Sequence, residues 1–144
     1  TGNLREGKGI IDATSGVLKG TPYSFHTRFE NEPGTNPEEL IAAAHAGCYS
    51  MAFSATLADK GYAPRKIETH ATCIMTPQQG GGFAITEMHL RVRGEVPGLD
   101  DNQAYGVSLD DAIRNLTGEK VRLTAGAFSA GRELDLRLHW GFRY

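Results

Sequence analysis

The chain has 144 residues and a formal net charge of −2 at pH 7. This length predicts one domain, residues 1–144, that is large enough to bury a hydrophobic core. The small net charge gives no indication of a nucleic-acid partner or of binding to an anionic membrane surface. We see no apolar run long enough to cross a bilayer and therefore expect no membrane partner.

The cysteine content indicates a reducing compartment. Cys48 and Cys73 are the two cysteines of the chain, too few for a disulfide scaffold. The first ten residues contain no apolar core of a signal peptide. Both observations favour a cytoplasmic location, where thiols stay reduced.

The first third of the chain reads as a β-hairpin followed by a loop. Residues 9–13 and 17–28 are the predicted arms, with the turn at residues 14–16. Over residues 23–29, aromatic residues and threonine alternate with polar residues, which predicts a strand with Ser24, His26 and Arg28 on its polar face. A polar loop, residues 30–34, follows.

Residues 35–61 predict one long helix with a clear start and stop. Asn36 is a suitable N-cap, Pro37 takes the first helical position, and Glu39 completes the spacing of a capping box. Lys60 followed by Gly61 is a typical helix end.

One face of this helix carries small apolar residues at helical spacing, and we expect that face to be buried. Its small side chains would allow a second helix or another backbone to approach closely. The predicted stripe consists of Leu40, Ala44, Cys48, Met51, Ala55 and Ala58.

The remaining elements complete an α+β order. Strands are predicted at 65–76 and 83–96 with a glycine-rich turn at 78–82, a second helix at 101–117, and a terminal strand with apolar residues at every second position from 134 to 140. Residues 119–131 fit a short helix, a strand or a loop. Segregated hairpins and two helices favour an α+β fold over a doubly wound parallel sheet.

Cys48 has two interpretations. It could be a small hydrophobe in a helix contact, because unpaired cysteines are often buried. It could instead be a nucleophile, which requires a cation to favour the thiolate. Cys48 is too far along the helix for the helix dipole to act, and Arg28 in the preceding segment is the candidate cation.

A zinc site is the alternative use of the thiols. His45 and Cys48 are three residues apart on a helix and share a face, and His70 and Cys73 have the same spacing. The second pair fails on a strand, where an odd offset places side chains on opposite faces. We therefore predict no metal ligands, and read His45 as a packing or dimer-interface residue.

Two long motifs carry a resemblance to a known family. The segment HTRFE, then GTNPEELIAAAHAGC, and the later FAITEMHLRVRGEVPGLD resemble the osmotically inducible protein C (OsmC) family, which is related to the organic hydroperoxide resistance (Ohr) proteins. The resemblance implies β-sheets packed around a long central helix and a second helix, in an intertwined homodimer. It also implies a thiol-dependent peroxidase that reduces organic hydroperoxides and protects against oxidative stress, without metal or organic cofactor.

The resemblance also assigns the site residues. It implies that Cys48 is the peroxidatic nucleophile, that Arg28 stabilises the thiolate and the leaving alkoxide, and that Glu38 holds the guanidinium of Arg28. Glu38 and Cys48 are ten residues apart on one helix, or about 15 Å at 1.5 Å per residue. If both serve one site, Glu38, together with Arg28, comes most simply from the partner subunit of the homodimer.

The chain departs from the family pattern in one respect. Family members carry a second, resolving cysteine after the second helix, whereas residues 118–131 contain no cysteine. Either an external thiol or dithiol reductant, or Cys73, regenerates Cys48, or the fold has become a weakly active or non-catalytic structural or ligand-binding dimer. A third interpretation is that the sequence of residues 118–131 is in error.

Overall fold

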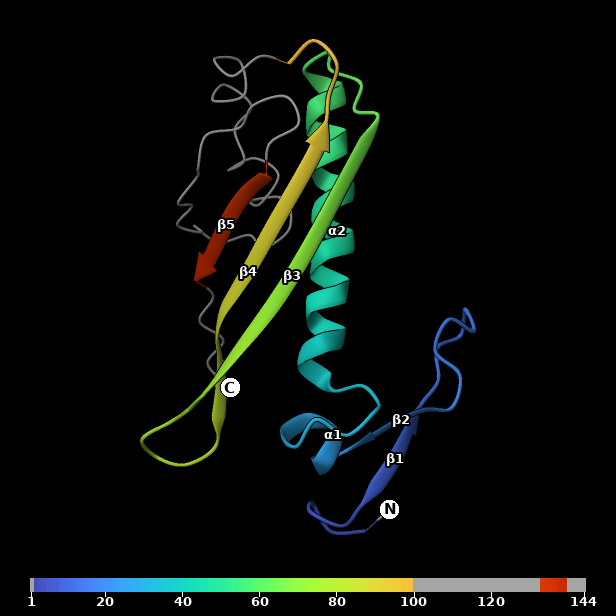
Figure 1. Cartoon of the computed structure of the whole chain (residues 1–144), viewed down its shortest axis with the longest axis vertical. Coiled ribbons are helices and arrows are strands. Elements are labelled where there is room, and N and C mark those ends of the chain that lie inside the picture. The colour runs from blue at the N-terminus through green and yellow to red at the C-terminus, as the bar shows by residue number, and fades with distance from the viewer. Residues whose placement is uncertain (1, 100–132, 140–144) are drawn as a thin grey trace. The chain divides into compact units, whose positions relative to one another are not determined.

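The computed structural model describes residues 2–99 and 133–139, with side chains for residues 2–99. The chain divides into two compact units, Thr1–Ile41 and Ala42–Tyr144. The first unit holds β1, β2 and α1, and the second holds most of α2 with the sheet β3-β4-β5 (Figure 1). The predicted helix at 101–117 and the segment 119–131 lie outside the described residues, and the single domain stays a prediction.

A short hairpin forms the first unit. Strands β1 (Lys8–Ile11) and β2 (Thr21–Ser24) pair antiparallel, with Gly9 opposite Tyr23. The predicted hairpin is confirmed, but its arms are shorter than expected. The connection therefore runs over residues 12–20, where Gly16 has a φ of 78° that favours glycine.

The helix α1 (Phe25–Phe29) takes the place of most of the strand that we predicted over residues 23–29, so that prediction is wrong from Phe25 onward, whereas residues 23 and 24 lie in β2. Ser24 is its N-cap: the hydroxyl of Ser24 accepts from the backbone N–H of Thr27, and the hydroxyl of Thr27 accepts from the N–H of Ser24. This reciprocal capping satisfies donors that a strand would need a neighbour to satisfy. Local capping therefore overrides the alternating pattern.

The long helix α2 (Pro37–Asp59) confirms the predicted start and stop. The side-chain oxygen of Asn36 accepts from the N–H of Glu39 at 2.8 Å, which caps the first turn. Gly61 has a φ of 86°, and its N–H donates to the carbonyl of Ala58 at 2.9 Å, which closes the last turn.

The face of α2 that is buried within the chain is not the one that we predicted. Four residues at spacings of seven, four and four, most of them large, form it, whereas Cys48 is exposed and Met51 is 77% exposed. Since α2 is apolar on both sides, its periodicity could not distinguish the two faces. The larger residues fill more of the core and face the sheet. The buried residues are Ala42, Tyr49, Phe53 and Leu57.

By length and composition, α2 is also apolar enough to cross a membrane, with a mean hydropathy of 1.3 over 18 residues. Our expectation that no apolar segment reaches this length is therefore wrong. The core helix of a folded domain passes the same test, and α2 packs its large side chains in the same hydrophobic core as residues of the sheet.

An antiparallel sheet forms the rest of the second unit. Strands β3 (Lys66–Pro77), β4 (Phe83–Glu95) and β5 (Glu133–His139) are hydrogen-bonded in the order β3-β4-β5, and α2 lies along the sheet (Figure 1). The N–H of Gln78 donates to the carbonyl of Gly82 at 3.1 Å, which closes the predicted glycine-rich turn.

The core lies between this sheet and α2. The strand predicted at 83–96 is confirmed, and its residues Met88, Leu90 and Val92, at every second position, are fully buried. They pack in one cluster with the large residues of α2, and Cys73 of β3 packs against that cluster. Together with the order of elements, this arrangement confirms the α+β class.

Candidate active site

The clearest charged arrangement in the first unit is the pair Arg28–Glu38. The Nε of Arg28 donates to one carboxylate oxygen of Glu38 at 3.0 Å, and an Nη donates to the other at 2.5 Å. This geometry is bidentate, which fixes the plane of the guanidinium as well as its position. The side chain of Glu38 is 14% exposed and that of Arg28 is 30% exposed, so water screens the pair only in part.

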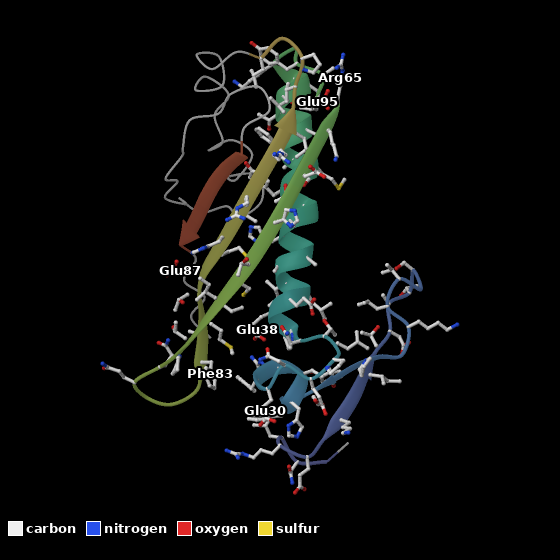
Figure 2. The ribbon with its side chains drawn as sticks, viewed as in Figure 1. Glu30, Glu38, Arg65, Phe83, Glu87 and Glu95 are labelled. Carbon is white, nitrogen blue, oxygen red and sulfur yellow. The ribbon has the colours of Figure 1, made fainter. Side chains whose placement is uncertain are left out.

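The secondary structure explains why these two side chains meet. Arg28 lies in the last turn of α1, and Glu38 lies at the beginning of α2 (Figure 2), where a carboxylate also stabilises the positive end of the helix dipole. The guanidinium carbon of Arg28 lies 5.1 Å from the centre of the Phe29 ring, a cation–π distance. The predicted partnership of Arg28 and Glu38 is thus present, and it is made within one chain.

Cys48 lies in the second unit, on the exposed face of α2. Its thiol forms no disulfide, and its neighbours on that face are small or flexible apolar residues such as Ala44 and Met51. An exposed thiol is open to a peroxide, unlike one buried in a core. That Cys48 shares a site with the Arg28–Glu38 pair stays a prediction.

The other potential ligands do not converge on a metal site. Cys73 packs toward the core of the second unit, whereas His70 is exposed on the same strand, as the odd offset predicts. Over residues 2–99, no group of three or more His, Cys, Asp or Glu side chains could hold a metal ion. Burial lowers the pKa of His45, which keeps its imidazole neutral near pH 7.

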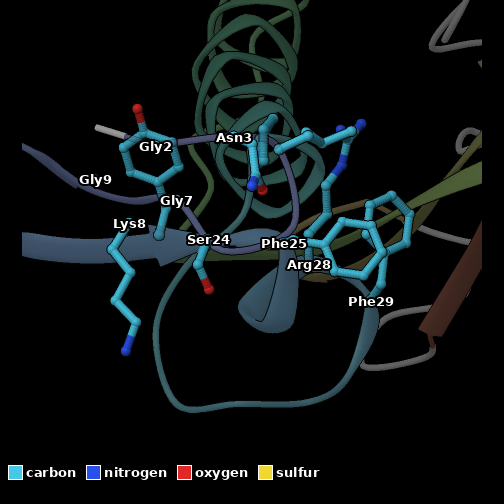
Figure 3. Close-up of a pocket in the computed structure, with 12 residues that line it drawn as sticks. Gly2, Asn3, Gly7, Lys8, Gly9, Ser24, Phe25, Arg28 and Phe29 are labelled. Atoms are coloured by element: carbon cyan, nitrogen blue, oxygen red, sulfur yellow. The ribbon is translucent and has the colours of Figure 1, made fainter.

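A pocket of about 240 Å³ lies beside Arg28 in the first unit. The aromatic rings of Phe25 and Phe29 and the side chain of Arg28 gather on one side of it (Figure 3). Residues of the N-terminal segment, among them Asn3 and Leu4, form other parts of its wall. The pocket therefore combines an apolar wall with two basic side chains, Lys8 and the Arg28 that Glu38 holds.

Sequence reasoning missed the residues that hold α1 in place. Thr27 and Thr35 are both buried, and the Thr27 hydroxyl donates to the Thr35 carbonyl at 2.8 Å. The spacing of Ser24 and Thr27, which fits reciprocal capping, was a usable signal for a short helix. Nothing in the sequence indicated the contact with Thr35, which depends on the path of the loop.

Comparison with known proteins gives consistent matches. Residues 29–115 match the family described as OsmC-like protein. The chain is 47% identical over 106 residues to the protein named peroxiredoxin OsmC of Escherichia coli (strain K12), covering 74% of this chain and 73% of that protein, and equally to its namesake in Shigella flexneri. The crystal structure of the organic hydroperoxide resistance protein OhrB of Bacillus subtilis has the same fold, with a TM-score of 0.59, 21% identity and 82% of each chain covered.

Proposed function

Because the chain belongs to the OsmC-like protein family, we infer that it is a thiol-dependent peroxidase that reduces organic hydroperoxides and protects against oxidative stress. The family match confirms the resemblance read from its motifs, and the likeness to OhrB confirms the α+β fold that the resemblance implied. Within the molecule, the observation that carries this function is the bidentate Arg28–Glu38 pair on a chain whose Cys48 thiol is exposed.

The proposed reaction uses Cys48 as the nucleophile. Its thiolate sulfur attacks the distal oxygen of the hydroperoxide, the S–O bond forms, and the O–O bond breaks. The alkoxide takes up a proton and leaves as an alcohol, and the sulfur, oxidised by two electrons, becomes a sulfenic acid. Arg28 stabilises the thiolate and the developing alkoxide, while Glu38 keeps the guanidinium in place. The cycle requires no metal or organic cofactor.

We propose that the active enzyme is a homodimer. Glu38 and Cys48 are ten residues apart on α2, about 15 Å along its axis, so one chain cannot easily bring both to one peroxide. The exposed face of α2 supports the pairing, because it is lined by small apolar residues around Cys48 and Met51. A second copy on that face would cover them and bring its own Arg28–Glu38 pair.

The pocket beside Arg28 favours bulky organic hydroperoxides over hydrogen peroxide. Phe25 and Phe29 offer an apolar wall to the organic group while the guanidinium faces the peroxide. Hydrogen peroxide has no apolar part and gains nothing from that wall. The preference for organic substrates thus follows from the same side chains that surround the proposed catalytic cation.

The geometry of the second unit favours an external thiol as the reductant. The Ser50 hydroxyl donates to the Thr69 hydroxyl at 2.7 Å, which aligns β3 with α2. The strand β3 runs antiparallel to α2 (Figure 1), so the step from Thr69 to Cys73 points toward the N-terminal end of α2. Along that direction Cys73 lies about 13 Å from Thr69, whereas Cys48 lies only about 3 Å from Ser50. The remaining separation of about 10 Å exceeds the span of a disulfide. We propose that thiols of the reducing cytoplasm regenerate Cys48.

An assay of peroxide consumption with a dithiol reductant tests the proposal. We expect the wild type to consume cumene hydroperoxide catalytically and Cys48→Ser to lose that activity. Cys73→Ser is the matched control and should keep it. Equal, slow consumption by the wild type and Cys48→Ser would contradict the proposal and favour a non-catalytic dimer.

A further inference from the structure

The helix that carries Arg28 is too short to hold itself in place. α1 has five residues, and helices of this length are unstable unless other contacts fix them. Its N-terminal end is fixed by the reciprocal bonds between Ser24 and Thr27, at 3.1 and 2.8 Å. Arg28 follows Thr27 directly, so the position of Arg28 depends on what holds Thr27.

Thr27 is bonded to the loop that leads into α2. Its hydroxyl donates to the Thr35 carbonyl at 2.8 Å, which is shorter than its 3.0 Å contact with the Ser24 carbonyl. The Thr35 N–H donates to the Pro22 carbonyl at 3.0 Å, and the Thr35 hydroxyl donates to Glu39 at 2.8 Å. These bonds connect β2, α1 and the first turn of α2.

Both threonines are buried, so water cannot replace the hydrogen bonds that they make. Thr27 is 8% exposed and Thr35 is 6% exposed, and over residues 2–99 these are the buried polar residues. A buried carbonyl that loses its donor has no water to replace it. The loop should therefore not leave Thr27 without an energetic penalty.

The loop also passes too close to Thr27 for any side chain to intervene. Gly34 has a φ of 152°, and a Cβ there would lie 2.7 Å from both the Pro22 carbonyl oxygen and the Thr27 Cγ2. Glycine is required at this position for both reasons. The loop thus fits directly against Thr27, as well as being hydrogen-bonded to it.

We propose that Thr27 is a positioning residue for the peroxidase reaction: its hydroxyl, bonded to the Thr35 carbonyl, fixes α1 against the start of α2 so that Arg28 stays paired with Glu38. The two elements bonded through Thr27 and Thr35 are the two that carry the ion pair. This inference rests on the proposed function for its catalytic consequence, but its structural part can be tested without activity.

The structural test observes the Nε–H of Arg28 by NMR. In the wild type this proton donates to Glu38 and should exchange slowly with water. We expect Thr27→Val, which removes the hydroxyl but keeps the shape, to speed exchange by about tenfold or more. Thr27→Ser should restore slow exchange, and Thr14→Val, at an exposed site of the same unit, should not change it.

The kinetic test combines Thr27→Val with removal of the cation. We expect Thr27→Val to lower kcat/KM for cumene hydroperoxide about tenfold, because a displaced catalytic group loses much of its effect. In an Arg28→Met background, the same change should have no further effect, since a positioning residue acts only through the group that it positions. A purely structural role would lower both backgrounds equally.

The outcomes separate this inference from the proposed function. Unchanged Arg28 exchange in Thr27→Val, or an equal kinetic loss in the Arg28→Met background, would overturn it. If Thr27→Val does not fold, Gly34→Ala replaces it, because this variant keeps the Thr27 hydroxyl but displaces the loop. Gly34→Ala should show the same faster exchange of the Arg28 Nε–H. Slow exchange in Gly34→Ala would overturn the inference. Wild type without peroxidase activity would contradict the proposed function, while the NMR arm would still decide the role of Thr27.

Discussion

At the scale of single residues, the proposed mechanism assigns the two requirements of a reactive thiol to different side chains. Cys48 provides an exposed sulfur, and Arg28 provides a cation that Glu38 holds in a bidentate bond. A thiolate is the reactive form, and a neighbouring cation increases its fraction at neutral pH. His45 and Tyr49 are neighbours of Cys48 on α2 but are not part of the proposed chemistry. For each of them we expect a substitution to have a measurable effect on the free energy of unfolding.

Tyr49 contains a buried hydroxyl that has no hydrogen-bond partner within residues 2–99. Burying such a group is unfavourable, so Tyr49→Phe should leave the free energy of unfolding unchanged or raise it by up to about 1 kcal/mol. Urea unfolding measures this, with the exposed Tyr23→Phe as the control. A loss of more than about 1 kcal/mol would mean that the hydroxyl has a partner from outside these residues.

His45 should make stability fall in mild acid. Burial lowers the pKa of His45 below its ordinary 6.5, so the unfolded chain binds more protons than the folded one below that pH. The contribution of His45 is present above pH 6.5 and is lost as the pH falls toward the lowered value. Urea unfolding at pH 7.5 and pH 5 should show a smaller loss for His45→Gln than for the wild type, whereas the exposed His70→Gln should behave like the wild type. An identical loss in His45→Gln would contradict this.

At the scale of elements, the residues that begin and end a helix could be predicted from the sequence. Which face of α2 packs on the sheet could not. Asn36 and Gly61 fix the ends of α2 through bonds to nearby backbone, which a sequence pattern can indicate. The buried face of β4 follows the alternation of a strand, in which every second side chain points to the same side, and here that side is apolar. On α2 both faces were apolar, so which one would meet the sheet depended on the size of residues such as Tyr49 and Phe53.

The first helix shows a second limit of pattern reading. Alternating aromatic and polar residues after Ser24 fit a strand, yet the Ser24–Thr27 capping bonds make a helix there. The identity of Arg28 and Glu38 as candidates came from motif resemblance, whereas their contact within one chain required the path of the loop. The bond from Thr27 to Thr35 is of the same kind.

Gly61 tests the account of how α2 ends. Its φ of 86° is unfavourable for residues with a Cβ, although nothing lies within 4 Å of where that atom would be. Gly61→Ala should therefore lower the free energy of unfolding by about 1 kcal/mol through backbone strain alone. Gly80→Ala, also in open space but without a positive φ, should change it by less than half as much. Equal effects of the two substitutions would contradict the role of Gly61.

At the scale of the whole molecule, the exposed apolar face of α2 is the strongest indication of a second copy. A single chain would leave Ala44, Cys48 and Met51 in water. Glu38 and Cys48 are ten residues apart on one helix, and this spacing favours a second chain if both act on one peroxide. Both observations support the proposed homodimer.

Met51→Glu should separate the proposed dimer. Met51 is 77% exposed in the chain, so a charge there does not disturb the core, but it would be buried between two copies. Sedimentation velocity should show about twice the 15.6 kDa chain mass for the wild type and one chain mass for Met51→Glu. Thr72→Glu, on the exposed side of β3, should remain dimeric. A monomeric wild type would contradict the dimer.

The central claim is that Cys48 is the sulfur that a hydroperoxide oxidises. Its most direct test is mass spectrometry after one equivalent of cumene hydroperoxide in the presence of dimedone, which traps sulfenic acids. We expect a dimedone adduct on Cys48, unchanged in Cys73→Ser and strongly reduced in Arg28→Met. An adduct on Cys73 with Cys48 unmodified would contradict it.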